Sequence, residues 1–98
     1  MTTKVELSEQ VLNFVRSLAP EPRRTLRLGL RGLEEGRGDI KQLEGELAGW
    51  CRLRVRSYRV IFRYETDGGQ RVARCIFAER RALVYELFAE ALRNLLEE

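Results

Sequence analysis

The spacing of hydrophobic residues at the start of the chain changes from a strand period to a helix period. Over residues 4–7 apolar and charged side chains alternate, which predicts a short strand that buries Val5 and Leu7. From residue 8 the spacing becomes three and four, and one side of a predicted helix carries Val11, Phe14, Val15 and Leu18. Ser8 is placed to cap this helix, because its hydroxyl can accept a bond from an unpaired backbone N–H.

A second helix is predicted directly after the first. Prolines in residues 19–22 break the first helix, and Pro22 suits the first turn of the next one, where a missing N–H has no cost. Leu26, Leu30 and Leu33 then share one face, and the glycines of residues 36–38 end the helix. Two helices with so short a connection are expected to form an antiparallel hairpin. Residues 39–50 are interrupted by glycines and are predicted to be a connection.

Three strands and a final helix are predicted in the second half. The strands are expected at residues 51–55, 58–65 and 71–77, and Asp-Gly-Gly at 67–69 is a hairpin turn between the last two. In the middle strand Tyr58, Val60, Phe62 and Tyr64 would share one face, and Arg59, Ile61 and Arg63 the other. The final helix is predicted over residues 82–96, with a stripe of Val84, Phe88, Ala91, Leu92 and Leu95.

These elements predict an α+β fold in the order β-α-α-β-β-β-α, built on a small, mainly antiparallel sheet. The 98 residues suffice for one domain but not for two, so we expect residues 1–98 to form a single domain. Each helix has a single apolar stripe, so we expect the helices to cover one face of the sheet. The other face is then left to the charged residues.

Composition narrows the class of protein. No apolar run reaches the roughly 20 residues of a membrane span, and the N-terminus has no signal-peptide pattern. Cys51 and Cys75 fall in predicted strands without a CxxC spacing, so we interpret them as buried free thiols and expect a cytoplasmic protein. The sequence has no histidine, which removes the commonest general base and metal ligand. No cofactor or metal site is indicated.

Positive charge is concentrated in the predicted sheet. Arginine occupies alternate positions 52, 54 and 56, and Arg59 follows. Residues 51–81 contain nine arginines and three acids, a net charge of +6, so the rest of the chain has a net charge of −3. A row of guanidinium groups on one strand face is typical of a site for phosphate or another polyanion. The alternative is a solvated strand face in a chain that favours arginine over lysine.

Five segments in this order resemble the RelE/ParE superfamily of bacterial toxins. They are residues 5–8 (VELS), 41–45 (KQLEG), 50–55 (WCRLRV), 57–62 (SYRVIF) and 76–85 (IFAERRALVY). The resemblance covers almost the whole chain, and the order and spacing of the segments make it specific. For RelE-like members it implies a ribosome-bound enzyme that cleaves mRNA, in which the 2′-hydroxyl attacks the adjacent phosphate to leave a 2′,3′-cyclic phosphate.

The resemblance also implies site residues and partners. The family's catalytic positions correspond here to Arg52, Arg54, Arg59, Arg80 and Tyr85. We add Arg56, Arg63 and Arg81 as RNA-binding residues. RelE has lysines in place of Arg52 and Arg54, and because arginine stays protonated it is a poor base. The nearby candidates for the base are Glu79, at a position that is often histidine in the family, and Tyr85, which could instead stack on an RNA base.

The expected partners are a cognate antitoxin protein, the ribosome and mRNA, with no membrane and no metal, and a homo-oligomer is left open. The alternatives are a ParE-like inhibitor of DNA gyrase, and a non-toxic member that binds an antitoxin and regulates its operon. The nuclease is favoured because the basic residues and the tyrosine are all present. For single residues, packing or ion pairing is the alternative to a role in the site, above all for Arg59 and Tyr85.

Overall fold

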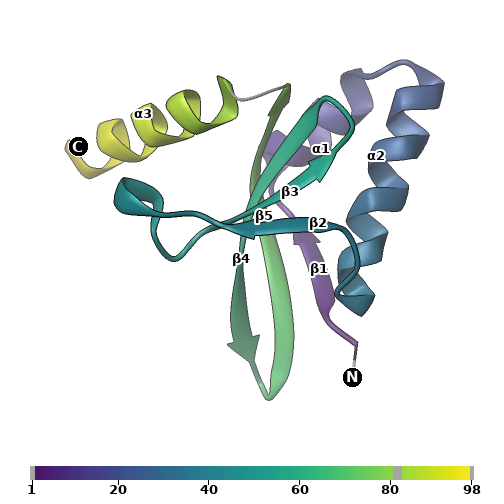
Figure 1. Cartoon of the computed structure of the whole chain (residues 1–98), viewed down its shortest axis with the longest axis horizontal. Helices are drawn as coiled ribbons and strands as arrows, with labels where there is room; N and C mark the ends of the chain where they lie inside the picture. The colour runs from purple at the N-terminus through teal and green to yellow at the C-terminus, as the bar shows by residue number, and fades with distance from the viewer. Residues whose placement is uncertain (1, 81–82, 98) are drawn as a thin grey trace.

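A five-stranded sheet with helices on both of its faces forms the fold (Figure 1). The structure is a computed structural model and describes residues 2–80 and 83–97, with the side chains of 83 and 84 excepted. The strands lie in the order β1-β5-β4-β3-β2; β1 is parallel to β5 and the other neighbours are antiparallel. Their bounds are β1 Lys4–Leu7, β2 Asp39–Gln42, β3 Cys51–Val55, β4 Tyr58–Asp67 and β5 Gln70–Arg80. The predicted α+β class is confirmed.

The strand β2 was not predicted, so the expected element order is wrong by one strand. Residues 39–42 pair antiparallel with β3, with Asp39 opposite Arg54 and Lys41 opposite Arg52. The remainder of the predicted connection contains a short 3-10 helix, Gly45–Leu47. A strand of four mostly exposed residues buries too little apolar surface to leave a clear sequence pattern. This edge strand places an acid and a lysine beside the arginines of β3.

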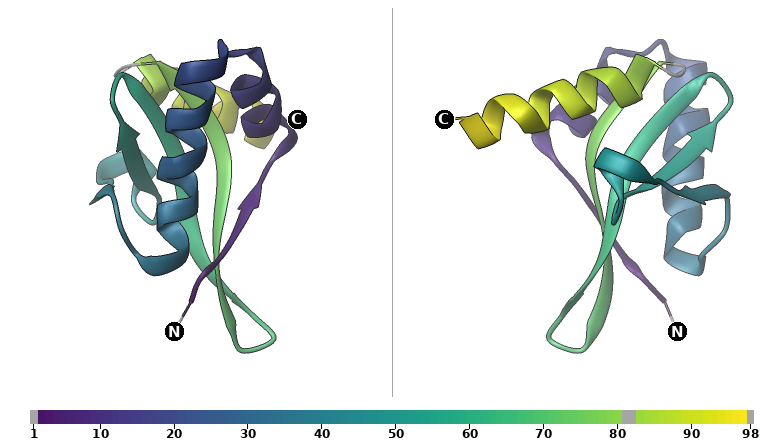
Figure 2. Two further views of the ribbon diagram at one scale, coloured as in Figure 1. Left: turned by 90° about the vertical axis from the view of Figure 1, so that its right-hand side faces the viewer. Right: turned by 60° about the vertical axis from the view of Figure 1, so that its left-hand side comes forward.

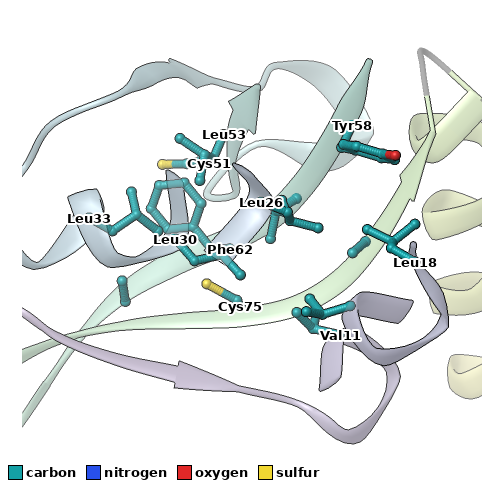
Figure 3. Close-up of a cluster of buried hydrophobic side chains, with 14 residues drawn as sticks. Val11, Leu18, Leu26, Leu30, Leu33, Cys51, Leu53, Tyr58, Phe62 and Cys75 are labelled. Carbon is teal, nitrogen blue, oxygen red and sulfur yellow. The ribbon is translucent and has the colours of Figure 1, made fainter. Parts of the chain in front are cut away.

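The helical hairpin covers one face of the sheet, as predicted. It consists of α1, Glu9–Ser17, and α2, Pro20–Gly32, followed by a 3-10 turn, Leu33–Glu35. Ser8 caps α1 as expected, its hydroxyl accepting from the Val11 N–H. The second helix begins two residues earlier than Pro22, because Pro20 itself occupies its first turn. Figure 3 shows the leucines of the hairpin packed against the inward side chains of β3, β4 and β5.

The final helix lies on the opposite face, which corrects the expectation that all helices share one face. This helix, α3, spans Leu83–Glu97. Its Phe88 packs edge-on to Trp50, with ring centroids 5.1 Å apart, and lies 5.8 Å from Phe77. Ile61 of β4 is fully buried in the same cluster. The sheet thus separates α3 from α1 and α2 (Figure 2), and β4 is buried on both faces near its centre.

The faces predicted for the middle strand are confirmed, but the last two strands are longer than predicted, since β4 continues to Asp67 and β5 spans Gln70–Arg80. The middle strand has Tyr58, Val60 and Phe62 on the hairpin side and Ile61 on the α3 side. Both cysteines are free and buried. In the described part of the chain, no helix combines the length and apolar character that crossing a membrane requires.

Candidate functional site

Three predicted site residues lie side by side on the three middle strands of the sheet, near one end of these strands. Arg54 of β3 is opposite Arg59 of β4, and Arg59 is opposite Glu79 of β5. Facing pairs on neighbouring strands project to the same face, which here is the α3 side of the sheet. We call these three residues the arginine row. It lies next to the β3–β4 turn, and Figure 1 shows this turn and the start of α3 at the same end of the sheet.

The two arginines of this row differ in what holds them. Arg59 is half-buried, and its Nη1 donates to the carbonyls of Arg56 and Tyr58, at 3.0 and 3.1 Å. Arg54 is exposed and takes part in no ion pair among the described residues. Like charges directly across a strand pair are unfavourable. A bound anion between the two guanidinium groups would remove that cost.

Arg56 lies in the turn that leads into the row. Its φ of 54° is in the left-handed region, where side chains other than glycine and asparagine are strained. The residue is exposed, and its carbonyl accepts from Arg59. The turn therefore holds the Arg59 guanidinium and presents a third positive charge at the same end of the sheet.

Arg52 lies on the same face but is already neutralised. Its side chain is 11% exposed, and its Nη1 is 3.4 Å from the Asp39 carboxylate of β2. Across β4 its neighbour is the buried Ile61, not another charge. Arg52 thus packs against the hydrophobic cluster under α3 and gives less free charge to the surface than the sequence pattern indicated.

Glu79 is placed as a neighbour of Arg59 without being its ion-pair partner. Its Oε1 accepts from the Arg80 backbone N–H at 2.9 Å. No Arg59–Glu79 ion pair within 4.0 Å occurs in the described structure. A carboxylate next to an arginine pair has the placement needed for a general base acting on a group that the arginines hold.

The structure does not bring Arg80 and Arg63 to the arginine row. Arg80 faces Tyr58 across β4–β5, and its guanidinium carbon is 5.8 Å from the Tyr58 ring centroid, on the hairpin side of the sheet. Arg63 lies over the Trp50 ring, with its guanidinium carbon 4.7 Å from the centroid. Arg81 lies outside the described residues.

Much of the positive charge of the sheet is paired at its other end. Glu65 accepts from Arg63 at 2.6 Å and from Arg74 at 2.7 Å, and Arg74 also contacts Glu6 and Asp67. The bond from Arg63, and then that from Arg74, holds the pKa of the Glu65 carboxyl below its usual value. The clustering of arginines in the sequence therefore overstates the free positive charge of the sheet, because acids of β1 and β4 offset the arginines at the end opposite the arginine row.

Tyr85 lies in a neighbouring cleft rather than in the row. It is half-buried on α3 and packs against the cluster of Ile61 and Phe88. The cleft beside it has a volume of about 390 Å³ and is lined by Lys41, Gln42, Leu43, Glu44, Leu47 and Tyr85. Lys41 neighbours Arg52 in the sheet, so the cleft adjoins the basic face. Sequence reasoning missed Lys41 because it missed β2; the alternation of Asp39, Ile40 and Lys41 was the available signal.

The arrangement is suited to binding an anionic backbone across the end of the sheet. The exposed guanidinium groups of Arg54 and Arg56 can contact phosphate oxygens, and Tyr85 is placed to contact a base in the cleft. No group of three or more His, Cys, Asp or Glu side chains within the described residues is arranged to hold a metal ion.

Comparisons with known proteins agree on the fold. No protein-family model matches the sequence, and no curated protein matches it. Among solved structures, the archaeal RelE–RelB complex from Pyrococcus horikoshii is 27% identical, with 84% of this chain and 98% of that chain covered and a TM-score of 0.62. An arginine-to-alanine double mutant of the E. coli toxin RelE in the free state is 23% identical, with 96% and 98% covered and a TM-score of 0.66.

A third structure, the toxin–antitoxin complex RelBE2 from Mycobacterium tuberculosis, is 19% identical, with 83% of this chain and 100% of that chain covered and a TM-score of 0.64. All three similarities extend over most of both chains, so they concern the whole arrangement of the sheet and its helices. The chain therefore has the fold of these RelE toxin structures.

Proposed function

We propose that this protein is the toxin of a toxin–antitoxin pair and that it cleaves RNA at the arginine row. The observation that carries the proposal is the adjacency of Arg54, Arg59 and Glu79 on one open end of the sheet. Two cations that form no ion pair within the described residues, beside a carboxylate, combine a phosphate site with a candidate base. The similarity to toxins of known structure supports the first half of the proposal.

The chemistry requires charge stabilisation more than covalent catalysis. The 2′-oxygen of a ribose bonds to the adjacent phosphorus, and the bond from phosphorus to the 5′-oxygen breaks, leaving a 2′,3′-cyclic phosphate. Arg54 and Arg59 stabilise the negative charge that develops on the phosphate oxygens, a contribution of about 3 kcal/mol for one such group. Glu79 accepts the 2′-hydroxyl proton, and water or the Tyr85 hydroxyl protonates the departing 5′-oxygen.

The roles of the other predicted residues follow from their placement. Arg56 extends the phosphate contacts at the turn, and Tyr85 with Lys41 lines the cleft for a neighbouring base. Arg52 holds β3 to β2 through its ion pair with Asp39, and it adds positive charge two residues before Arg54 on β3. Arg80 remains a catalytic candidate from the family resemblance, and Arg63 and Arg81 remain RNA-binding candidates from the sequence. Of these, Arg63 and Arg80 lie away from the arginine row.

Partners follow from the same proposal. The structures from P. horikoshii and M. tuberculosis are complexes of a toxin with an antitoxin, and we propose an antitoxin partner for this chain too. We further propose that the substrate is mRNA on the ribosome, in the cytoplasm. A single-stranded message threaded over an open sheet end can reach both the arginine row and the Tyr85 cleft.

The test is induction of the chain without an antitoxin, followed by primer extension on a chosen mRNA. We expect growth arrest and new 5′ ends, with both effects lost in Arg54→Ala and in Glu79→Gln. Arg71→Ala is the matched control, since Arg71 is an exposed arginine stacked over Tyr64 at the other end of the sheet. Intact mRNA together with DNA damage would contradict the proposed nuclease and would indicate an inhibitor of DNA gyrase. Unimpaired growth with tight antitoxin binding would indicate a non-toxic member.

A further inference from the structure

The outward face of α2 carries a second basic surface, separate from the arginine row. The helix contains four arginines and one acid, Glu21. Three arginines, Arg24, Arg27 and Arg31, are exposed and lie on one side of the helix because they are spaced at three, four and seven. This side points away from the sheet, since Leu26 and Leu30 on the opposite side are buried.

Nothing in the described structure neutralises these charges. None of the four arginines of α2 is in an ion pair there. Arg23 is fixed by two bonds from its guanidinium to the Leu18 carbonyl, at 3.3 and 2.9 Å. Arg27 is four residues from both Arg23 and Arg31, and like charges at that spacing destabilise a helix. The free protein therefore maintains a repulsive arrangement that an acidic partner would relieve.

An apolar residue lies in the middle of this charged surface. Leu28 is 58% exposed, between Arg24 and Arg31 on the same helix side. It lines a shallow groove of about 360 Å³ together with Pro20, Arg23, Arg24, Arg27 and Arg31. A large exposed side chain ringed by arginines is the composition of a protein-binding surface, in which an apolar centre is surrounded by charged groups.

We propose that this face of α2 is a docking site for an acidic amphipathic helix of a partner protein. The distance along the axis from Arg24 to Arg31 is about 10 Å, which matches two carboxylates placed two turns apart on a second helix. An apolar side chain between those carboxylates would cover Leu28. A nucleic acid would satisfy the arginines but would leave Leu28 in water, so the groove favours a peptide.

The site is independent of the proposed RNA cleavage. The hairpin packs on one face of the sheet, and the arginine row projects from the other, because its residues alternate with Leu53, Tyr58 and Val60 of the hairpin side. A helix bound to α2 would leave Arg54 and Arg59 open, so this contact recruits or tethers the protein and does not block the row. Binding here and cleavage there can be lost separately.

The probe for the test is a synthetic helical peptide of about five turns, with glutamates two turns apart and leucines between them on one side. It is titrated into the isotope-labelled full chain and followed by the backbone amide signals. We expect the shifts to gather at residues 23–31. We expect the dissociation constant to rise about tenfold in the variant Arg27→Glu, because reversal turns attraction into repulsion. Leu28→Ser should weaken binding as well.

Three controls separate the outcomes. Arg93→Glu makes the same charge change on α3, where Arg93 pairs with Glu46, and should leave the affinity unchanged. A peptide with serines for leucines should bind weakly, and one with glutamines for glutamates should lose its salt dependence. The proposal is overturned if the shifts gather at residues 52–59, if the leucines make no difference, or if an RNA oligonucleotide shifts residues 23–31 at lower concentration than the peptide. RNA cleavage, assayed separately with Arg54→Ala, tests the proposed function alone.

Discussion

The guanidinium of Arg52 lies 3.4 Å from the carboxylate of Asp39, and the Arg52 side chain is only 11% exposed. This ion pair joins β3 to the edge strand β2. It divides the arginines of β3 into two kinds, because Arg52 is paired and largely covered while Arg54 is exposed and without an ion pair among the described residues. The free charge of the strand therefore lies toward the β3–β4 turn.

Removing the acid of this pair should increase RNA binding. In Asp39→Asn the charge of Arg52 is no longer offset, so we expect single-stranded RNA to bind more tightly at low salt, with a steeper dependence on salt concentration. The free energy of unfolding should fall by about 1 kcal/mol, since Asp39 itself is half-exposed and its pair is partly screened. Filter binding at several salt concentrations and urea unfolding measure the two effects.

Asp67→Asn is the matched control for that change. It alters the net charge equally, but Asp67 contacts Arg74 at the other end of the sheet. If both variants raise the affinity by the same factor, total charge rather than the position of Arg52 determines RNA binding, and the assignment of the basic face is wrong.

Replacing Arg54 or Arg59 by alanine should weaken RNA binding in both cases, but only the Arg59 variant should lose stability. Arg59→Ala removes two hydrogen bonds that hold the β3–β4 turn, so we expect a loss of about 1 kcal/mol in the free energy of unfolding. Arg54→Ala should change it by less than about 0.5 kcal/mol, because its side chain is exposed and relief of repulsion from Arg59 offsets lost contacts. Each variant that loses one phosphate contact should lower the salt slope for single-stranded RNA by about 0.7.

The outcome that contradicts this distinction is a salt slope unchanged in both variants. Arg59→Lys refines the test, because lysine keeps the charge but lacks the rigid planar guanidinium that holds Nη1 between the two carbonyls. We expect it to bind RNA nearly as well as the wild type and to be destabilised as Arg59→Ala is.

The sequence predicted the elements whose hydrophobic periodicity is strong, and it failed for elements that consist mainly of exposed polar residues. The leucines of α2 and the alternation in β4 predicted their elements and buried faces correctly. The signal for β2 is weak, because only Ile40 of its four residues packs on the core. The alternation in β4 predicted one apolar face and left the other to charged residues. The position of α3 on that second face depends on Ile61 and Phe77 meeting Phe88, which no local pattern specifies.

For the candidate site, alternation predicted which arginines share a face but not which of them are free. Arg63 and Arg74 share the carboxylate of Glu65, and Glu65 meets Arg74 only because β4 and β5 pair in this register. Arg80 was grouped with Arg59 by resemblance, while its position next to Glu79 in the strand directs it to the other face. The number of charged residues in a segment therefore does not give the charge of a surface until the pairing of the strands is known.

Replacing Arg56 by glycine should stabilise the protein and weaken its RNA binding. Arg56 has a φ of 54°, which glycine adopts without strain. We expect the free energy of unfolding to rise by about 0.5–1 kcal/mol, the strain relieved less the extra entropy of an unfolded glycine. Arg56→Ala keeps the strain and serves as the control for the lost charge. Equal unfolding energies for the two variants would contradict this account of the turn, and urea titration measures them.

Two glycines of α2 should respond oppositely to alanine. A Cβ at Gly29 would lie 2.5 Å from Cγ2 of Val55, so Gly29→Ala forces α2 and β3 apart and should cost about 1–3 kcal/mol. At Gly32 the nearest atom is the Arg37 carbonyl oxygen at 3.4 Å, and alanine should stabilise the helix by up to about 1 kcal/mol. Thermal unfolding compares them. The variant Gly29→Ala with Val55→Ala should recover part of the loss, and equal stability of both single variants would contradict this packing.

The buried thiol of Cys75 should make the protein less stable at alkaline pH. Burial raises the pKa of Cys75 to about 12 from an ordinary value of 9.0. Between these values the thiol of the unfolded chain ionises while that of the folded chain keeps its proton, so the stability is full below pH 9 and falls above it. The slope reaches about 1.4 kcal/mol per pH unit from this group. Cys75→Ala removes the effect, and its cost in unfolding free energy, about 1 kcal/mol at pH 7 for the lost burial, should shrink or reverse at pH 10.

Urea unfolding in the presence of a reductant measures this difference, with Val72→Ala as the control. Val72 is as deeply buried as Cys75, lies on the same strand, β5, and does not titrate. The cost of its truncation should therefore be the same at both pH values. Other groups that ionise near pH 10 act equally on the wild type and both variants, and they cancel in the comparison. A cost of Cys75→Ala that stays constant from pH 7 to pH 10 would mean that the thiol ionises as readily in the folded protein as in the unfolded chain. Cys75 would then be open to solvent, and the contact between β5 and the helical hairpin would be looser than its packing indicates.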